Sequence, residues 1–120
     1  MHLETWYDGT LDLCQRLRIS PMAWSPLGGG RLFHEETKWA ESIRTEMYAV
    51  GEDRHPDGAG GASLDQVALA WILRHPARMV PILGTGRIER VRSAVQAESL
   101  ELSREQWFRI WVASLGKRLP

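Results

Sequence analysis

Two short apolar runs, residues 19–24 and 79–83, constrain the fold of this chain more than any other feature of its sequence. Each run is too short for a helix and lacks polar alternation, which is typical of a strand covered on both faces. Strands of that kind belong to parallel sheets, whose crossover connections usually contain helices. Because proline has no N–H to donate, we expect Pro21 and Pro81 at a strand's first residue, an edge or a bulge. The two runs therefore predict an α/β fold with a parallel sheet.

Two helices carry clear start signals. Ser63-Leu64-Asp65-Gln66 and Ser103-Arg104-Glu105-Gln106 are capping boxes, in which the serine oxygen and the glutamine side chain each satisfy an otherwise unpaired backbone N–H. The first helix should end before Pro76, because proline disfavours helical backbone in the residue before it. The second should be the terminal helix, with Leu102 packed on Trp107. Helical spacing places the following residues on the inward faces: Leu64, Val67, Ala68, Trp71 and Ile72, and then Trp107, Ile110 and Trp111.

Weaker patterns predict three more helices. One follows Asp8-Gly9, a second follows Gly86, and a third lies in residues 39–50 and ends at Gly51, since glycine commonly caps helices. We interpret the single cysteine as a small buried apolar residue in the first of these helices. The residues that carry the patterns are Leu13, Cys14 and Leu17; Ile88, Val91 and Val95; and Trp39, Ile43, Met47 and Val50.

The middle of the chain is rich in glycine and charged residues and has little to bury. Its last part, Gly51 to Gly61, has the composition of a mobile loop. We therefore divide the chain into three parts. Residues 1–27 contain a helix and the first strand, residues 28–62 form a flexible loop with a short helix, and residues 63–120 contain a helix, the second strand, another helix and the terminal helix.

The predicted elements do not make a complete fold. Two parallel strands leave both edges of their sheet open. A complete (β/α)₈ barrel takes roughly 250 residues, whereas this chain has 120. Its six tryptophans also need more cover than two strands provide. We expect the open surface to be covered by another chain, with self-association as the expected case, or by an upstream segment.

Composition excludes several classes of partner. Fifteen basic and 15 acidic residues give a formal net charge of +0, so no overall field draws the chain to nucleic acid or to an anionic membrane. No apolar run approaches the roughly 20 residues of a membrane span, and the start of the chain lacks the basic and apolar parts of a signal peptide. A single cysteine excludes an internal disulfide and fits a reducing compartment. We expect a cytoplasmic protein.

The loop after the first predicted strand is rich in glycine. It reads Trp24-Ser25-Pro26-Leu27-Gly28-Gly29-Gly30-Arg31. Glycines let backbone N–H groups approach a ligand closely, a hydroxyl is adjacent, and the guanidinium can pair with a phosphate. Ligands of parallel α/β folds bind at this end of the strands. Taken alone, however, the loop favours the alternative of an ordinary glycine-rich turn, because glycine clusters are common at turns.

The loop after the second predicted strand places cations at the start of a helix. It reads Gly84-Thr85-Gly86-Arg87-Ile88-Glu89-Arg90-Val91-Arg92. A helix N-terminus carries partial positive charge, so each exposed arginine there is destabilising by about 0.3–1 kcal/mol. Unpaired N–H groups, a threonine hydroxyl and two or three guanidiniums together suit a phosphate monoester. The alternative, which stays equally open, is a solvated charged face with one pair to Glu89.

These two loops are also where the chain resembles a known family. Pro21–Phe33 and Pro81–Val91 closely resemble the C-terminal part of bacterial aldo-keto reductases. The resemblance spans nearly the whole chain and includes the helix of residues 63–76 and the terminal helix at residues 106–110. It implies the C-terminal part of a (β/α)₈ TIM barrel, with residues 19–24 as the seventh strand and 79–83 as the eighth. It also implies an oxidoreductase that uses NADPH to reduce carbonyl groups.

The resemblance assigns the two loops to a nicotinamide cofactor. Many members carry a lysine where this chain has Gly84, and a Glu-Asn pair where it has Ser93-Ala94. The implied cofactor is NADPH; because of these two departures, NADH stays open as the alternative, and Arg87 and Arg90 are left to supply the positive charge. The residues implied to bind it are Trp24, which stacks on the nicotinamide ring; Ser25, Leu27, Gly28, Gly30 and Arg31, along the pyrophosphate; and Gly84, Thr85, Gly86, Arg87 and Arg90, around the adenosine 2′-phosphate.

The resemblance supplies no catalytic residue in this chain. The family's catalytic Asp, Tyr, Lys and His lie on its first four strands, upstream of every residue present here. The four histidines are scattered without the spacing of metal ligands, and neither tyrosine has a lysine at helical or strand spacing. We predict no catalytic residue, no metal site, and inactivity of the chain alone. A small carbonyl substrate is expected only when the N-terminal half of the barrel is supplied.

Three functions stay open at this point. The first, which the resemblance favours, is the cofactor-clamping part of an NADPH-dependent carbonyl reductase. The second is a domain that binds a nucleotide or phosphate without chemistry. The third is a self-associating module, whose nucleic-acid-binding version is weakened by the zero net charge.

Overall fold

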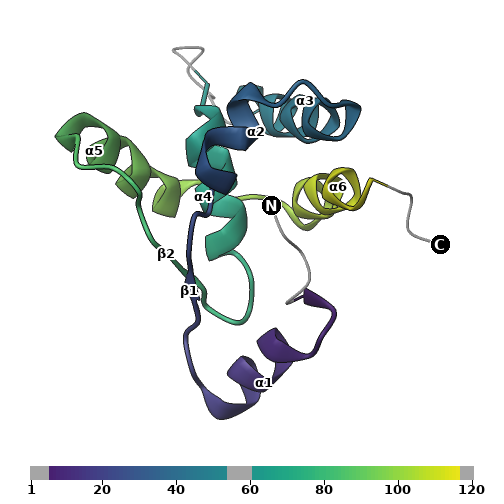
Figure 1. The fold of residues 1–120 in the computed structure, drawn as a ribbon, viewed down its shortest axis with the longest axis vertical. Coiled ribbons are helices and arrows are strands. Elements are labelled where there is room, and N and C mark those ends of the chain that lie inside the picture. Colours follow the sequence, from purple (N-terminus) through teal and green to yellow (C-terminus); the bar gives the residue numbers. More distant parts are fainter. Residues whose placement is uncertain (1–5, 54–60, 117–120) are drawn as a thin grey trace.

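The computed structural model describes residues 6–53 and 61–116 of the chain. Figure 1 shows a helix-rich molecule with two short strands side by side. None of the helices in the described residues is long and apolar enough to cross a membrane. In chain order the elements are α1 (Thr10–Leu17), β1 (Met22–Ala23), the 3-10 helix η2 (Gly28–Gly30), α2 (Arg31–His34), α3 (Lys38–Glu52), α4 (Leu64–Leu73), β2 (Val80–Pro81), α5 (Ile88–Gln96), the 3-10 helix η3 (Ala97–Ser99) and α6 (Arg104–Leu115).

The strands β1 and β2 pair in parallel, with Met22 opposite Val80 and Ala23 opposite Pro81. This confirms the predicted parallel sheet. Each strand is only two residues long, shorter than its apolar run, and each has one hydrogen-bonding neighbour in the described sheet. The N–H groups on either side of Pro81 both donate to β1 or its flank, Val80 to Pro21 O at 2.9 Å and Ile82 to Ala23 O at 3.0 Å. The missing N–H of Pro81 therefore lies on the open edge, as expected for a proline in a strand.

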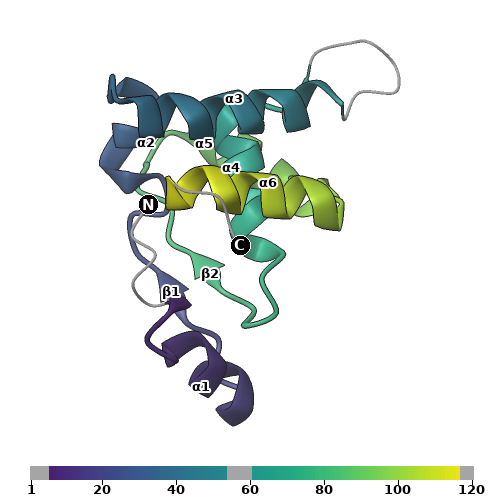
Figure 2. The same ribbon diagram turned by 90° about the vertical axis from the view of Figure 1, so that its right-hand side faces the viewer.

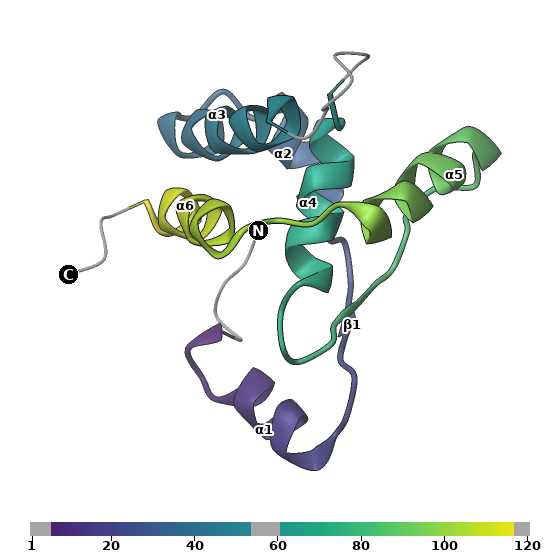
Figure 3. The ribbon, with the colours of Figure 1, turned by 180° about the vertical axis from the view of Figure 1, so that it is seen from behind.

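Helix α4 forms the centre of the molecule. It runs between α5 on one side and α3 and α6 on the other (Figures 1 and 3), and α3 and α6 lie side by side (Figure 2). A helix that is apolar on nearly every side is a buried helix. The core is therefore built around α4 and not on the small sheet. The buried residues of α4 include every residue predicted on its inward face: Leu64, Val67, Ala68, Leu69, Ala70, Trp71 and Ile72.

Both predicted capping boxes are present. The Ser63 N–H donates to Gln66 Oε1 at 2.9 Å at the start of α4. At the start of α6 the Ser103 N–H donates to Gln106 Oε1 at 2.9 Å, and the Gln106 N–H donates to Ser103 Oγ at 3.1 Å. Helix α4 ends at Leu73, ahead of Pro76, as predicted. These local side-chain bonds fix the first turns of the two helices that pack most of the core.

The prediction for Gly51 was wrong. Helix α3 continues past this residue to Glu52, and Gly51 is buried in its last turn. A Cβ atom at Gly51 would lie 2.6 Å from Ala62 O, a distance that real Cβ atoms essentially never show. The Ala62 N–H donates to Gly51 O at 3.2 Å. Glycine is therefore needed because the segment entering α4 passes directly against α3, and not because the helix ends there.

The middle of the chain buries more than its composition suggested. Helix α3 has 15 residues, and three of the four residues at the predicted helical spacing are buried in it, whereas Trp39 is half-buried. Ile43 and Met47 are fully buried, and Val50 is nearly so. The expected mobile loop of residues 51–61 lies mostly outside the described residues, which omit 54–60.

The two short helices form where predicted, but most of the apolar residues that predicted them are exposed. In α1, Leu13 and Leu17 are more than half exposed, Leu11 is buried in their place, and Cys14 is only half-buried. No residue of α5 is buried, and both Ile88 and Val95 are exposed. Figure 1 shows the reason: α1 and α5 each project from the helices around α4, so no described element covers their outer faces. The uncovered surface expected from the sequence is found on these helices and on the sheet.

Candidate functional site

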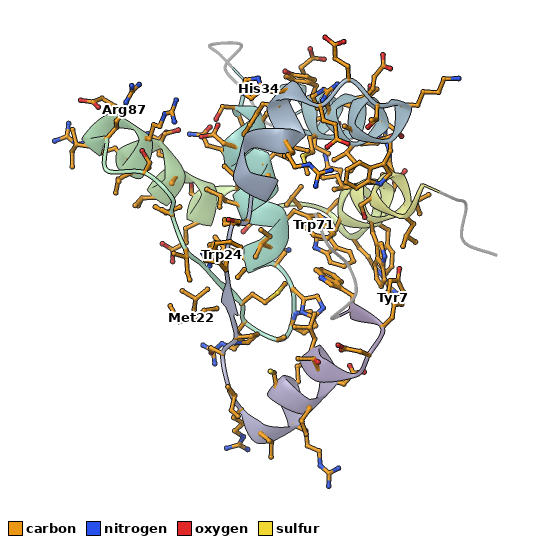
Figure 4. All side chains as sticks on the ribbon, viewed as in Figure 1. Tyr7, Met22, Trp24, His34, Trp71 and Arg87 are labelled. Carbon is orange, nitrogen blue, oxygen red and sulfur yellow. The ribbon has the colours of Figure 1, made fainter. Side chains whose placement is uncertain are left out.

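The loops after β1 and β2 leave the same edge of the sheet, because the strands are parallel and their carboxyl ends lie side by side. Figure 4 shows Trp24 at the end of β1 and Arg87 at the far end of the β2 loop, where α5 begins. The sequence predicted two separate groups of site residues in these loops. Both groups lie at the edge where parallel α/β folds bind ligands.

Trp24 is the most exposed large apolar side chain of the described residues, at 83%. The residue after it, Ser25, has a left-handed backbone with φ 47°, which residues other than glycine rarely adopt. Backbone strain of this kind is concentrated at ligand sites and switch regions. The Trp24 indole is thus exposed to solvent beside a strained turn. An exposed indole can stack its flat face on another aromatic ring.

The glycines after Trp24 do not present their N–H groups as predicted. The Gly28 N–H donates to Ser25 O at 2.8 Å, and the Gly30 N–H donates to Leu27 O at 3.2 Å. Gly28, Gly29 and Gly30 all have positive φ, so glycine is required here to fold the loop tightly. The N–H groups of Gly28 and Gly30, which were expected to face a ligand, therefore form hydrogen bonds within the loop. Leu27 is half-buried and packs against the core.

A cavity of about 620 Å³ opens beside this loop. Its lining includes Trp24, Ser25, Gly28 and Arg31, and the tryptophans of α3 and α4 extend its apolar wall. The Arg31 guanidinium lies at the rim, where its Nε contacts Glu35 Oε2 at 2.9 Å. Another groove, of about 750 Å³, lies between α3 and α6 and is lined by none of the predicted site residues.

The second loop is open and lacks a structural reason for its glycines. Gly84 and Gly86 have ordinary backbone angles, and a Cβ atom at either position would meet nothing within 4 Å. The loop conformation therefore leaves room for a ligand to approach the backbone. The Thr85 hydroxyl accepts a hydrogen bond from the Arg87 N–H at 3.2 Å, just before α5. That contact fixes the entry into the helix and leaves the threonine O–H available as a donor.

The arginines at the start of α5 are exposed and carry no described ion pair. Arg87 is the N-cap residue of the helix and makes no side-chain capping bond. Arg87, Arg90 and Arg92 are all exposed, and neither ion pair found in residues 6–53 and 61–116 involves them. The alternative of a solvated charged face included an ion pair to Glu89, and neither described ion pair involves that residue. Uncompensated cations at a positive helix end favour a bound anion.

The structure does not place the two groups in one cavity. Trp24, Ser25, Gly28 and Arg31 line the 620 Å³ cavity, whereas no residue from Gly84 to Arg90 does. The second group lies outside it, at the start of α5 (Figure 4). Any ligand that touched both groups would therefore have to be long, with one end in the cavity and the other on the surface.

Acid–base chemistry has little support in the described residues. His75 packs edge-on against Trp6 with ring centroids 4.5 Å apart, and its Nδ1 accepts a hydrogen bond from the Ala77 N–H at 3.1 Å. Burial lowers the pKa of His75, while nearby Asp12 opposes this shift. The described residues contain no group of three or more His, Cys, Asp or Glu that could hold a metal ion.

Sequence reasoning missed two residues that shape the first loop. Glu35 pairs with Arg31 at helical i,i+4 spacing, a signal that the sequence did contain. Arg44 of α3 donates from Nη1 to Leu32 O at 3.0 Å and to Glu35 O at 2.9 Å, which satisfies carbonyls at the end of α2. No pattern in the sequence linked Arg44 to this loop, because the contact depends on how α3 folds back over α2.

Comparison with known proteins gives a consistent result. The model of the aldo/keto reductase family matches residues 4–113. "Oxidoreductase YdhF" of Escherichia coli (strain K12) is 48% identical over 120 residues, which are 100% of this chain and 38% of that protein. A "6-dehydroglucose reductase" of Agrobacterium fabrum is 38% identical over 116 residues, covering 97% of this chain and 36% of that protein. The chain thus spans less than two-fifths of the length of these curated relatives.

A solved structure extends the likeness to the fold. The crystal structure of the thermostable aldo-keto reductase Tm1743, in complex with the inhibitor epalrestat, matches with a TM-score of 0.75 and 26% sequence identity. The match covers 93% of this chain and 36% of that chain. The helix-rich arrangement with two parallel strands is therefore part of an aldo-keto reductase barrel, as the sequence predicted. The chain belongs to the aldo/keto reductase family.

Proposed function

We propose that the chain binds a nicotinamide dinucleotide, NADPH more tightly than NADH, as the cofactor-binding part of a reductase that reduces carbonyl groups by hydride transfer. The observation that carries the proposal is the pairing of β1 with β2. It brings an exposed indole and a set of unpaired arginines to the same edge of the sheet. A dinucleotide has an aromatic ring at one end and, in NADPH, an extra phosphate at the other. Family membership supports the same cofactor class.

The proposed ligand contacts follow the chemistry of each group. The nicotinamide ring stacks on Trp24, and Arg31 pairs with the pyrophosphate at the cavity rim. Arg90 and Arg87 bind the adenosine 2′-phosphate, with the Thr85 hydroxyl as a further donor. The open backbone at Gly84 and Gly86 admits the ligand to the start of α5. Ser25, Leu27, Gly28 and Gly30 shape the loop between these contacts, since two of their N–H groups already bond within it.

The dinucleotide would supply the hydride, and this chain would bind and orient it. The family resemblance assigns the proton to a tyrosine on an upstream strand, which this chain does not contain. We therefore propose that the chain alone is inactive and that a carbonyl substrate binds only when that part of the barrel is supplied. We also place the protein in the cytoplasm, because its one cysteine is free and half-buried, as suits a reducing compartment.

A second candidate function, self-association, rests on the uncovered face of the sheet. Met22 and Val80 are paired across β1 and β2, and they are 69% and 47% exposed. Adjacent apolar side chains on one face of an edge-open sheet favour contact with another chain. We propose that a second copy covers this face.

Sedimentation velocity tests the self-association. We expect the wild-type chain to sediment as a dimer or larger, and Met22→Lys to shift it toward monomer because a charge would enter the contact. Tyr48→Lys is the matched control, since Tyr48 is also exposed, at 56%, but lies on α3. A wild-type chain that stays monomeric at high concentration would show that this face is not self-associating.

Titration with NADPH tests the dinucleotide site. We expect tryptophan emission to fall as NADPH binds, because the nicotinamide ring stacks on the indole of Trp24. Trp24→Ala should weaken binding about tenfold, within the range of roughly 1–3 kcal/mol measured for stacking of a base on an aromatic side chain. Trp24→Phe should keep much of the affinity and lose much of the emission change. If wild-type emission does not change at high NADPH concentration, the proposed site is wrong.

A further inference from the structure

The cavity beside Trp24 contains one cation and one anion, and they are paired with each other. Among the described residues that line it, Arg31 and Glu35 are the only charged side chains. The Arg31 Nε lies 2.9 Å from Glu35 Oε2. The Arg31 side chain is 64% exposed, whereas that of Glu35 is only 23% exposed. The anion is thus held against the protein, and the cation faces outward.

The backbone around this pair is firmly held. Three consecutive glycines with positive φ turn the chain into α2, and Gly30 is the N-cap of that helix. At its other end, Arg44 Nη1 donates to the carbonyls of Leu32 and Glu35 at 3.0 and 2.9 Å. The Glu35 N–H also donates to Arg31 O at 2.9 Å. Arg44 therefore fixes the end of α2, which keeps the Glu35 carboxylate within reach of Arg31.

We propose that Glu35 competes with the pyrophosphate of the dinucleotide for Arg31, so that Glu35 limits the affinity of the cavity. This inference rests on the proposed function and adds to it a residue that determines affinity. A carboxylate and a phosphate bind the same guanidinium through the same kind of charge-assisted hydrogen bond. The phosphate must therefore displace Glu35 or share Arg31 with it. A ligand without phosphate needs no such exchange, so the competition lowers the affinity of phosphate-bearing ligands alone.

The expected result is tighter binding when Glu35 loses its charge. We expect Glu35→Gln to lower the Kd for NADPH about three- to tenfold, because Arg31 becomes free and one nearby negative charge is removed. The gain should shrink at high salt, since Arg31 is largely exposed and its interactions are screened. Glu36→Gln is the matched control, because Glu36 is the adjacent exposed carboxylate and does not line the cavity.

A double-mutant cycle identifies the route of the effect. Kd values for NADPH are measured by calorimetry on the wild-type chain, Glu35→Gln, Glu36→Gln, Arg31→Gln and the Arg31→Gln/Glu35→Gln double variant. We expect the gain from Glu35→Gln to fall to about twofold or less when Arg31 is also replaced, because the competed group is then gone. Circular dichroism of each variant checks that the fold is unchanged.

The outcomes separate this inference from the function on which it rests. If all five proteins bind NADPH with the same Kd, the competition and the contact of Arg31 with the pyrophosphate are both wrong, and the contacts proposed for Trp24 and Arg90 stand. The competition is also overturned if Glu36→Gln tightens binding as much as Glu35→Gln, or if the gain persists in full without Arg31. If none of the five binds NADPH, both the competition and the dinucleotide site are wrong.

Discussion

Replacing Trp71 with alanine is expected to lower the free energy of unfolding by about 3–5 kcal/mol, the range for removal of a large aromatic side chain from a core. Trp71 is fully buried in α4. Its ring stacks on Trp6 at a centroid distance of 4.9 Å and on Trp107 at 5.1 Å, and the rings of Trp6 and Trp107 are themselves 5.8 Å apart. Removal of the ring therefore leaves a cavity against the other two indoles of this cluster.

Hydrogen bonds add to this cost. The Trp71 Nε1–H donates to Trp107 O at 2.9 Å, and the Trp107 Nε1–H donates to Trp71 O at 2.9 Å. The two indoles thus join α4 to α6 reciprocally, and alanine at position 71 removes one of these bonds. Trp71→Phe should keep most of the packing and lose the donor, at a cost of about 1–3 kcal/mol for the carbonyl left without its partner.

Urea denaturation followed by far-ultraviolet circular dichroism measures both variants. We expect the midpoint for Trp71→Ala to fall by about 2 M, given the usual urea sensitivity of small domains. Trp24→Ala is the matched control, because Trp24 is 83% exposed and exposed substitutions usually change stability by no more than about 0.5 kcal/mol. If Trp71→Ala unfolds at the same urea concentration as Trp24→Ala, the tryptophan cluster is not the centre of the core. If Trp71→Ala does not fold at all, Trp71→Phe provides the measurement.

Replacing Arg90 with alanine is expected to weaken NADPH binding about 10- to 100-fold and NADH binding less than threefold. The large loss corresponds to one or two charge-assisted hydrogen bonds to the 2′-phosphate, at about 1.5–3 kcal/mol for bonds to charged groups. NADH lacks that phosphate, so it has little to lose. Arg90 is exposed in the first turn of α5, and neither described ion pair would be broken by the change.

Calorimetric titration with each dinucleotide gives the two Kd values. Arg92→Ala is the matched control, since it removes the same charge from the same helix one position beyond the first turn and is not proposed to contact the phosphate. We expect its effect on NADPH to be threefold or less. If Arg90→Ala weakened the binding of NADPH and NADH equally, this arginine would not bind the 2′-phosphate.

Local signals in the sequence predicted much of the fold. The capping boxes at Ser63 and Ser103 form as expected because each depends only on residues within one helical turn. The parallel pairing of the strands also follows from their apolar composition. By contrast, Gly51 was assigned to a helix end. Its actual role depends on Ala62, which belongs to the segment that enters α4 and lies outside the helical turn around Gly51, so the local pattern did not reveal it.

Burial was harder to predict than helix position. Helical spacing correctly identified an apolar face in α1, but Leu13 and Leu17 are exposed because no described element packs on them. Periodicity shows which residues share a face and not what covers it. The same limit applies to the sheet, where Met22 and Val80 have the composition of buried strand residues and remain open to solvent.

The candidate site was predicted in its residue types and not in its contacts. Trp24 and the α5 arginines are exposed at the expected edge. The N–H groups of Gly28 and Gly30, however, bond inside their own loop. Which donors remain free depends on the exact turn that three glycines adopt, and their freedom of rotation is what makes that turn hard to read from sequence.

The most direct test is a crystal structure of the chain with NADPH bound, because the central claim is that one dinucleotide extends from Trp24 to Arg90. We predict the nicotinamide ring stacked on the Trp24 indole and the 2′-phosphate within hydrogen-bond distance, about 3 Å, of the Arg90 guanidinium. A bound NADPH whose ring lies away from Trp24, or whose 2′-phosphate contacts neither Arg90 nor Arg87, would contradict the claim.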